Sequence, residues 1–133
     1  MGIEKELYDL AFATSKEIKI SKDFELGSVG CALINEKGNI FLGKNLDMSC
    51  SLGMCAERNA ISTALTSSLS PIKKLICVHK SGKIITPCGA CVEFMKQMDF
   101  LTKDIEIIIS LDPIKTLKLN QLVSHWWRDE LNK

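Results

Sequence analysis

Apolar residues recur at intervals of three and four in four segments of the chain, with charged or polar residues between them. This period is typical of amphipathic helices that bury one face. The pattern predicts helices over residues 3–19, 56–69, 89–98 and 119–131. Pro71 ends the second of these helices, and Pro87 lies just before the third.

Shorter apolar runs predict strands. Residues 29–34 and 40–43 flank a turn that contains Gly and Asn, which favours a hairpin. Residues 74–79 and 105–110 read as buried strands, and Asp112-Pro113 ends the second. Because strands alternate with helices, we expect an α/β fold, a three-layer α/β/α sandwich with a mixed central sheet. No linker or repeat divides the chain, so we expect a single domain over residues 1–133.

Charge and hydropathy narrow the possible partners. The 133 residues include 17 Lys and Arg against 16 Asp and Glu, a formal net charge of +1. Such a balance argues against nucleic acid or an anionic membrane surface as the partner. The N-terminus is charged where a signal peptide would be apolar, and no apolar run approaches the roughly 18 residues of a membrane span. We therefore expect a cytoplasmic protein without a membrane partner.

The six cysteines are the most informative residues in the composition. In a reducing compartment they are metal ligands, nucleophiles or small core residues rather than disulfides. Cys55 opens one predicted helix, and Cys88 and Cys91 open the next, as C-A-E-R and P-C-x-x-C. Helix N-termini present free N–H groups and a positive dipole end, which stabilise thiolates. Three thiolates on one Zn²⁺ leave its fourth position open, as in catalytic zinc sites.

Two charged residues follow the first of these cysteines. Glu57 does not need to bind the metal, because a carboxylate beside a zinc-bound water can take its proton and pass it to a leaving group. The guanidinium of Arg58 would bond the ligand sulfurs and restore the electrophilicity that three thiolates remove from the metal.

The other cysteines have simpler interpretations. Cys31 and Cys77 lie in predicted strands and are expected in the core, and Cys50 is expected in an exposed loop. A different reading of the C-x-x-C pair is a redox dithiol, which would form a reversible Cys88–Cys91 disulfide without zinc. That reading leaves the C-A-E segment without a role.

The C-A-E-R and P-C-x-x-C pair resembles the cytidine deaminase superfamily, in the three-cysteine branch that acts on free nucleosides. The resemblance extends over most of the chain, from Val29-Gly30-Cys31 to Cys91. It implies the same α/β/α sandwich, a homo-oligomer that is usually a tetramer, and active sites near subunit boundaries. Polynucleotide-editing relatives have His as the first ligand, where this chain has Cys55.

The resemblance also implies the residues that hold the substrate. G-K-N-L-D resembles the family's G-x-N-x-E segment, in which the asparagine and the acid hold the ribose hydroxyls, so Asn45 and Asp47 take these roles. Asp47 is about one methylene shorter than the family's Glu, and loop-forming turn chemistry is a second explanation for both residues. The backbone of Ala56 is expected to contact the substrate as well.

An aromatic side chain stacks on the base in the family, from a segment like F-x-V-G-A. Here Phe24 serves only if extra residues before Val29 bulge; otherwise it is a core residue, and Gly27 stands at the strict equivalent. Val92-Glu93 replaces the family's Arg-Gln after the cysteine pair. The tail with Trp126-Trp127 suits a subunit interface or a pocket lid.

These features predict zinc-dependent hydrolytic deamination of cytidine or deoxycytidine at C4 of the cytosine, with Glu57 as the proton carrier and ammonia as a product. The short loop before Cys55 is similar to that of blasticidin-S deaminase, which acts on a cytosine nucleoside antibiotic. Two alternatives lie outside the deaminases: a zinc protein that no longer acts on a substrate, and a thiol redox protein.

Overall fold

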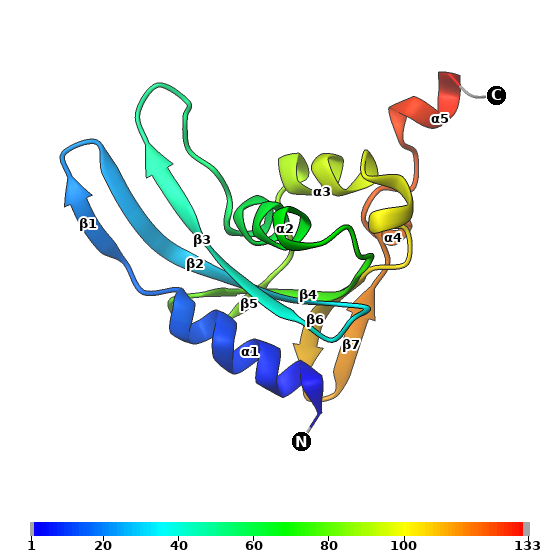
Figure 1. Cartoon of the computed structure of the whole chain (residues 1–133), viewed down its shortest axis with the longest axis horizontal. Coiled ribbons are helices and arrows are strands. Elements are labelled where there is room, and N and C mark those ends of the chain that lie inside the picture. Colours follow the sequence, from blue (N-terminus) through cyan, green and yellow to red (C-terminus); the bar gives the residue numbers. More distant parts are fainter. Residues whose placement is uncertain (1, 132–133) are drawn as a thin grey trace.

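One sheet with helices on both faces makes up the computed structural model, which describes residues 2–131 (Figure 1). Helix α1 (Ile3–Thr14) covers one face, and α2 (Ala56–Ser67) and α3 (Gly89–Lys96) cover the other. The sheet between these helices is mostly antiparallel, but β4 (Ile72–His79) and β6 (Glu106–Leu111) pair in parallel. The predicted three-layer α/β/α fold is confirmed.

Strand β2 (Phe24–Asn35) organises the sheet because it has three partners. Strand β3 (Ile40–Met48) pairs along one of its edges. On the other edge, β1 (Ile18–Ser21) pairs with the first residues of β2, and β4 pairs with the rest. The long β2–β3 pair therefore extends beyond the helices and forms, with β1, a three-stranded projection of the sheet (Figure 1).

The first helix is shorter than its sequence pattern predicts. It ends at Thr14, where the backbone N–H of Ser15 returns to Phe12 O, and the prediction of a helix to residue 19 is wrong. Ile18 fits both a helical and a two-residue period, but Ile20 follows it at the strand spacing. Pairing with β2 decides in favour of the strand.

The C-terminal third also differs from its prediction. Strand β6 turns at Asp112-Pro113 into β7 (Ile114–Leu117), an edge strand that the sequence pattern did not reveal. The helix predicted over residues 119–131 is instead two short helices, α4 (Leu119–Leu122) and α5 (Trp127–Leu131). The remaining short elements are β5 (Ile84–Ile85), beside β4, and a 3₁₀ turn, η1 (Asp99–Leu101).

The core lies on both faces of β2 and β4. Leu33, Cys31 and Cys77 face α2 and α3, whereas Ala32 and Ile76 face α1. All five are at most 1% exposed, so the prediction of Cys31 and Cys77 as core residues is confirmed. This packing holds the beginnings of α2 and α3 on one face of the sheet.

Candidate metal centre

Three cysteine sulfurs meet where α2 and α3 begin. Cys55 and Cys88 are the residues just before the two helices, both in extended conformation, and Cys91 lies in the first turn of α3. The Sγ of Cys88 lies 3.4 Å from the Sγ of Cys55 and 3.4 Å from the Sγ of Cys91. All three sulfurs lie within 4.8 Å of one another, which confirms that the predicted cluster forms.

The sulfur positions fit a tetrahedral zinc ion. Zinc binds thiolate sulfur at about 2.3 Å, so two sulfurs on one tetrahedral ion lie about 3.8 Å apart. The closest pairs need to separate by only a few tenths of an ångström from their 3.4 Å spacing. Three thiolate ligands also favour zinc, because magnesium and calcium prefer oxygen ligands.

Burial and neighbouring charge set the ionisation of the three thiols. Burial, together with the Cys88 thiol, raises the pKa of Cys55, and burial with the Glu57 carboxylate raises the pKa of Cys91. Partial burial also opposes ionisation of Cys88, but the Cys91 backbone N–H and the two neighbouring thiols outweigh it and lower the pKa of Cys88. Two of the thiols therefore need a nearby cation to ionise near neutral pH, a role that a bound metal fulfils.

The guanidinium of Arg58 is hydrogen-bonded to one of these sulfurs. Its Nη2 lies 3.7 Å from the Sγ of Cys55, and this contact raises the pKa of the guanidinium. Its Nε is buried and has no hydrogen-bond partner among the described residues. This contact puts a positive charge beside the Cys55 sulfur, and the role of Arg58 toward a bound metal stays a prediction.

Glu57 is a buried carboxyl group beside the cluster. It lies in the first turn of α2 and is only 4% exposed. Its charge raises the pKa values of Cys91 and Cys77, which shows that it is close to both. Between residues 2 and 131, no hydrogen bond or ion pair engages this carboxyl group. Buried carboxyl groups are normally paired, so an unpaired one beside a metal site is typical of a catalytic acid or base.

Asn45 and Asp47 lie on the α2 side of β3. A Cβ on Gly43 would lie 2.4 Å from Ala60 N of α2, so this face of β3 touches the helix. Side chains alternate along a strand, which puts Asn45 and Asp47 on the face of Gly43. The Oδ1 of Asn45 accepts a hydrogen bond of 2.9 Å from the backbone N–H of Val29, so its amide NH₂ is the group left for a ligand.

Asp47 lies further out along the projection than Asn45. It pairs across the strands with Glu25, and both border a small cavity of about 200 Å³ near the β1–β2 turn. Like charges directly opposite each other destabilise a strand pair, so the Glu25–Asp47 pairing does not stabilise β2 against β3.

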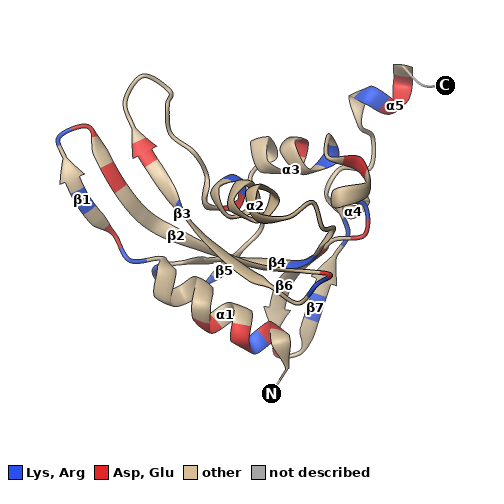
Figure 2. Cartoon of the chain, in the orientation of Figure 1, with Lys and Arg blue, Asp and Glu red and all other residues tan. Residues whose placement is uncertain are grey.

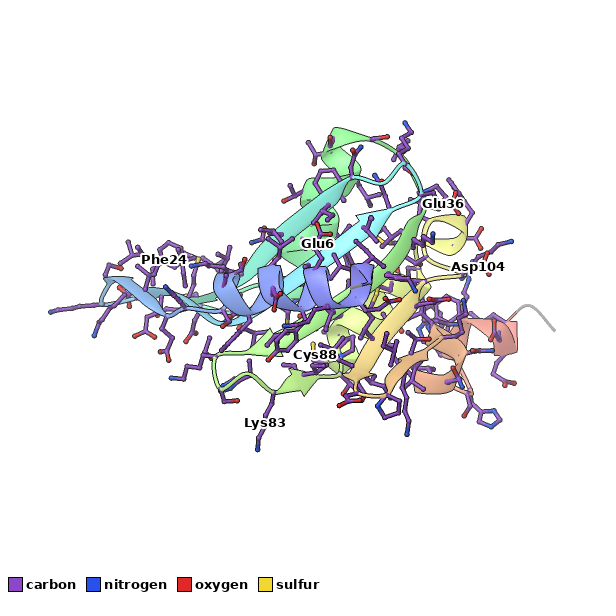
Figure 3. All side chains as sticks on the ribbon, turned by 90° about the horizontal axis from the view of Figure 1, so that it is seen from below. Glu6, Phe24, Glu36, Lys83, Cys88 and Asp104 are labelled. Atoms are coloured by element: carbon purple, nitrogen blue, oxygen red, sulfur yellow. The ribbon has the colours of Figure 1, made fainter. Side chains whose placement is uncertain are left out.

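Phe24 does not reach the cluster of its own chain. It pairs with Met48 and therefore lies on the opposite face from Asp47. Figure 3 shows Phe24 at one extremity of the molecule and Cys88 in the middle of it. The stacking role of Phe24 thus stays a prediction, and a single copy of the chain does not satisfy it.

The extra residues in β2 do bulge. The register with β3 shifts between Leu26 and Gly30, and Gly27 has a φ of +87°. A Cβ at Gly27 would lie 2.5 Å from Lys16 O, so no aromatic side chain fits at the position equivalent to the family's stacking residue. The backbone of Lys16 and Glu17, between α1 and β1, occupies that place instead.

A set of contacts between α3 and the tail was not predicted from the sequence. The Glu93 carboxylate accepts hydrogen bonds from Trp126 Nε1 at 2.9 Å, Trp127 Nε1 at 3.1 Å and Gln97 Nε2 at 2.7 Å. We call these contacts the Glu93 clasp. The departure from the family's Arg-Gln at this point was the available signal, because a carboxylate accepts more bonds than an amide oxygen.

The three cysteines do not border the cavity of about 700 Å³ near the β6 end of the sheet. This cavity is bordered by Glu36, Lys73, Phe100 and Asp104 among others. Glu36 and Asp104 are well separated from Cys88 in Figure 3.

The chain matches the family model described as the cytidine and deoxycytidylate deaminase zinc-binding region, over residues 1–106. A probable cytidine deaminase of Dictyostelium discoideum is 37% identical over 68 residues, which are 50% of this chain and 46% of that protein. A cytidine deaminase of Sporosarcina psychrophila is 39% identical over 64 residues, 47% of each chain. This chain thus spans about half the length of the curated relatives it matches.

Solved structures agree with the fold over nearly the whole chain. The crystal structure of cytidine deaminase from Mycobacterium tuberculosis matches with a TM-score of 0.75 and 19% identity, covering 96% of this chain and 98% of that one. The cytidine deaminase from Burkholderia pseudomallei matches with a TM-score of 0.70 and 25% identity, covering 92% and 96%.

Proposed function

Since the chain belongs to the cytidine and deoxycytidylate deaminase family, we propose that it deaminates a free cytosine nucleoside by zinc-dependent hydrolysis. Cytidine or deoxycytidine would be converted to uridine or deoxyuridine with release of ammonia. The observation that carries the proposal is the Glu57 carboxyl, buried and unpaired within residues 2–131 beside three convergent sulfurs.

Each residue of the site has a distinct role in this reaction. Cys55, Cys88 and Cys91 would hold Zn²⁺, which supplies an activated water when bound. The Glu57 carboxylate would accept one proton of the attacking water and pass it to N3 of the base. It would then take the second proton from the oxygen now bonded to C4 and pass it to the amino group, which leaves as ammonia. Burial of Glu57 keeps bulk water from competing for these protons. Arg58 bonds the Cys55 sulfur and reduces the charge that the sulfurs donate.

The substrate would be held by residues on the α2 side of the sheet. The Asn45 amide NH₂ is free to donate to a ribose oxygen, because Val29 already occupies its Oδ1. Asp47 would accept from a second ribose hydroxyl, and the backbone of Ala56 at the start of α2 would contact the base. Blasticidin S is the second candidate substrate, because Asp47 in place of Glu and the short loop before Cys55 alter the ribose side of the site.

We propose a homo-oligomer, with a tetramer favoured. The α1 side of the projection carries a row of apolar residues: Ile18, Phe24, Leu26, Leu46 and Met48. Two of them, together with the neighbouring Ile20, are exposed in the single chain. A second copy would bury this row, which lies on the face of the projection opposite to Asn45 and Asp47.

The proposed partner is a small nucleoside rather than nucleic acid, and the proposed setting is pyrimidine salvage in the cytoplasm. Figure 2 shows Lys and Arg interspersed with Asp and Glu along the ribbon, and the formal net charge of +1 does not favour a phosphate backbone as the partner. All six cysteines are free, as expected in a reducing compartment. Among residues 2–131, none of the helices combines the length and the apolar character needed to cross a membrane.

Glu57→Gln tests the proposal most directly. The amide cannot carry protons but has nearly the same size, so we expect the variant to retain stoichiometric zinc and to lose turnover by about a hundredfold or more. Metal content is measured first, and ultraviolet absorbance is then followed with cytidine, deoxycytidine and blasticidin S. Glu6→Gln makes the same chemical change at an exposed position of α1, on the opposite face of the sheet from the cluster, and serves as the matched control.

The outcomes separate the alternatives. Near-normal turnover in Glu57→Gln would exclude Glu57 as the proton carrier. A zinc-loaded wild-type protein that deaminates none of the three compounds is a zinc protein without this activity. A protein whose reduced form takes up no supplied zinc, and which cycles between a Cys88–Cys91 disulfide and two thiols, is a redox protein.

A further inference from the structure

Cys88 occupies a special place among the three sulfurs. It is the exposed member, whereas Cys55 is half-buried and Cys91 is buried. Its Sγ is also the one that lies 3.4 Å from each of the other two. An exposed thiol with two thiols in van der Waals contact needs a movement of little more than an ångström to form a disulfide with either of them.

We propose that Cys88 is a thiol-modification site: in the metal-free chain, peroxide converts it with Cys55 or Cys91 into a disulfide, and bound zinc prevents this. The proposal rests on the proposed zinc site and is independent of deamination. It joins the zinc and the dithiol interpretations of the C-x-x-C pair as two states of one cluster.

The chemistry balances with peroxide as the oxidant. The Cys88 sulfur attacks one peroxide oxygen, the O–O bond breaks, and a sulfenic acid and one water form. The thiol of Cys55 or Cys91 then attacks the Cys88 sulfur, an S–S bond forms, and the hydroxyl leaves as a second water. Two thiols and one peroxide thus give one disulfide and two waters.

The other three cysteines provide internal comparisons. Cys31 and Cys77 pair across β2 and β4 but are at most 1% exposed, so peroxide has no direct access to them. Cys50 is exposed but lies outside the cluster. Cys50 and Cys88 are both exposed, but only Cys88 has neighbouring thiols in the cluster. We therefore expect peroxide to form a disulfide at Cys88 and not at Cys50.

The test uses the full chain with Cys50→Ser, which removes the unrelated exposed thiol. Metal-free protein is treated with hydrogen peroxide, and intact mass and peptide mapping follow the reaction. We expect a loss of about 2 Da, with Cys88 in the disulfide. The loss should persist in Cys55→Ser and in Cys91→Ser, because one partner remains in each. It should disappear in Cys88→Ser.

Zinc protection is the second measurement. At a free zinc concentration about a hundred times Kd, roughly one molecule in a hundred is metal-free, so we expect the reaction to slow by about tenfold or more. Zinc analysis of the same samples reports metal binding separately. Absence of zinc binding would therefore count against the proposed function, whatever happens to the thiols of metal-free protein.

Three results would overturn the inference. They are an unchanged rate with zinc present, equal disulfide formation in Cys88→Ser, and a mapped disulfide that lacks Cys88 in the reference protein. The last result needs no substitution in the cluster, so it remains decisive even if Cys88→Ser does not fold.

Discussion

Replacing Gly43 by alanine is expected to separate α2 from β3 and to weaken both stability and the site. Gly43 lies where the helix crosses the strand. An added Cβ would lie 2.4 Å from Ala60 N, 2.6 Å from Ala56 O and 2.9 Å from Ala60 Cα. All three are backbone atoms, so no side chain can rotate away to make room. The helix or the strand has to move as a unit.

The size of the effect follows from these distances. Carbon makes favourable contacts at about 3.5 Å or more, so α2 must withdraw by about 1 Å. Overpacking of this kind costs about 1–3 kcal/mol of unfolding free energy. Because Glu57 is one residue from Ala56 on the displaced helix, the carboxyl group that we propose as the proton carrier moves too. A shift of about 1 Å in a catalytic group lowers turnover by about a hundredfold.

Urea unfolding, zinc content and cytidine turnover measure the three consequences. Gly89→Ala is the matched control, because it adds the same methyl group at the start of α3 with nothing within 4 Å. We expect that control to stay within about 0.5 kcal/mol of the wild type. A Gly43→Ala protein with the wild-type urea midpoint and turnover would refute the close contact between α2 and β3.

Two further predictions concern charge. The Lys74 ammonium lowers the pKa of Glu106. The pKa of Glu4 is lowered mainly by a backbone hydrogen bond and, next in size, by Lys74. Carboxyl groups with a lowered pKa stabilise the fold above their ordinary pKa, and this stability is lost as pH falls through the lowered value. Lys74→Met should therefore reduce the urea midpoint at pH 7 and flatten its decline below pH 5; parallel curves would contradict this. Hydrogen bonds from Gln97 and the tail indoles lower the pKa of Glu93. Since the chain has two tryptophans, both in the clasp, their emission should change only at a pH below the ordinary carboxyl pKa, and Glu93→Gln should abolish that change.

The zinc cluster was predictable from sequence because its information is local. Cys55 and Cys88 each stand at the start of a helix that hydrophobic periodicity identifies. The two helices follow β3 and the β4–β5 pair, which lie on opposite edges of β2, and both helices pack on the same face of the sheet. Cys91 and Glu57 follow within one helical turn of these positions. Knowledge of the two helix starts was therefore enough to bring together the sulfurs and the carboxyl group.

The edges of the fold were less predictable. Strands β1 and β7 are each four residues long, and their assignment depends on the strands they pair with rather than on their own pattern. The Glu93 clasp joins residues more than thirty positions apart. No spacing rule connects an acid on α3 with indoles of the tail, although the acid itself departs from the family pattern.

The base-stacking position shows why motif spacing is insufficient in a strand. Side chains alternate between the two faces, so each inserted residue moves the following side chains to the other face unless a bulge absorbs it. The bulge between Leu26 and Gly30 keeps Val29 in place for Asn45, but it leaves Phe24 on the α1 side. Gly27, the strict equivalent, has no room for a side chain. In the proposed deaminase, neither of these two positions therefore places an aromatic ring on the base, and the ring would come from another segment or from a second copy of the chain.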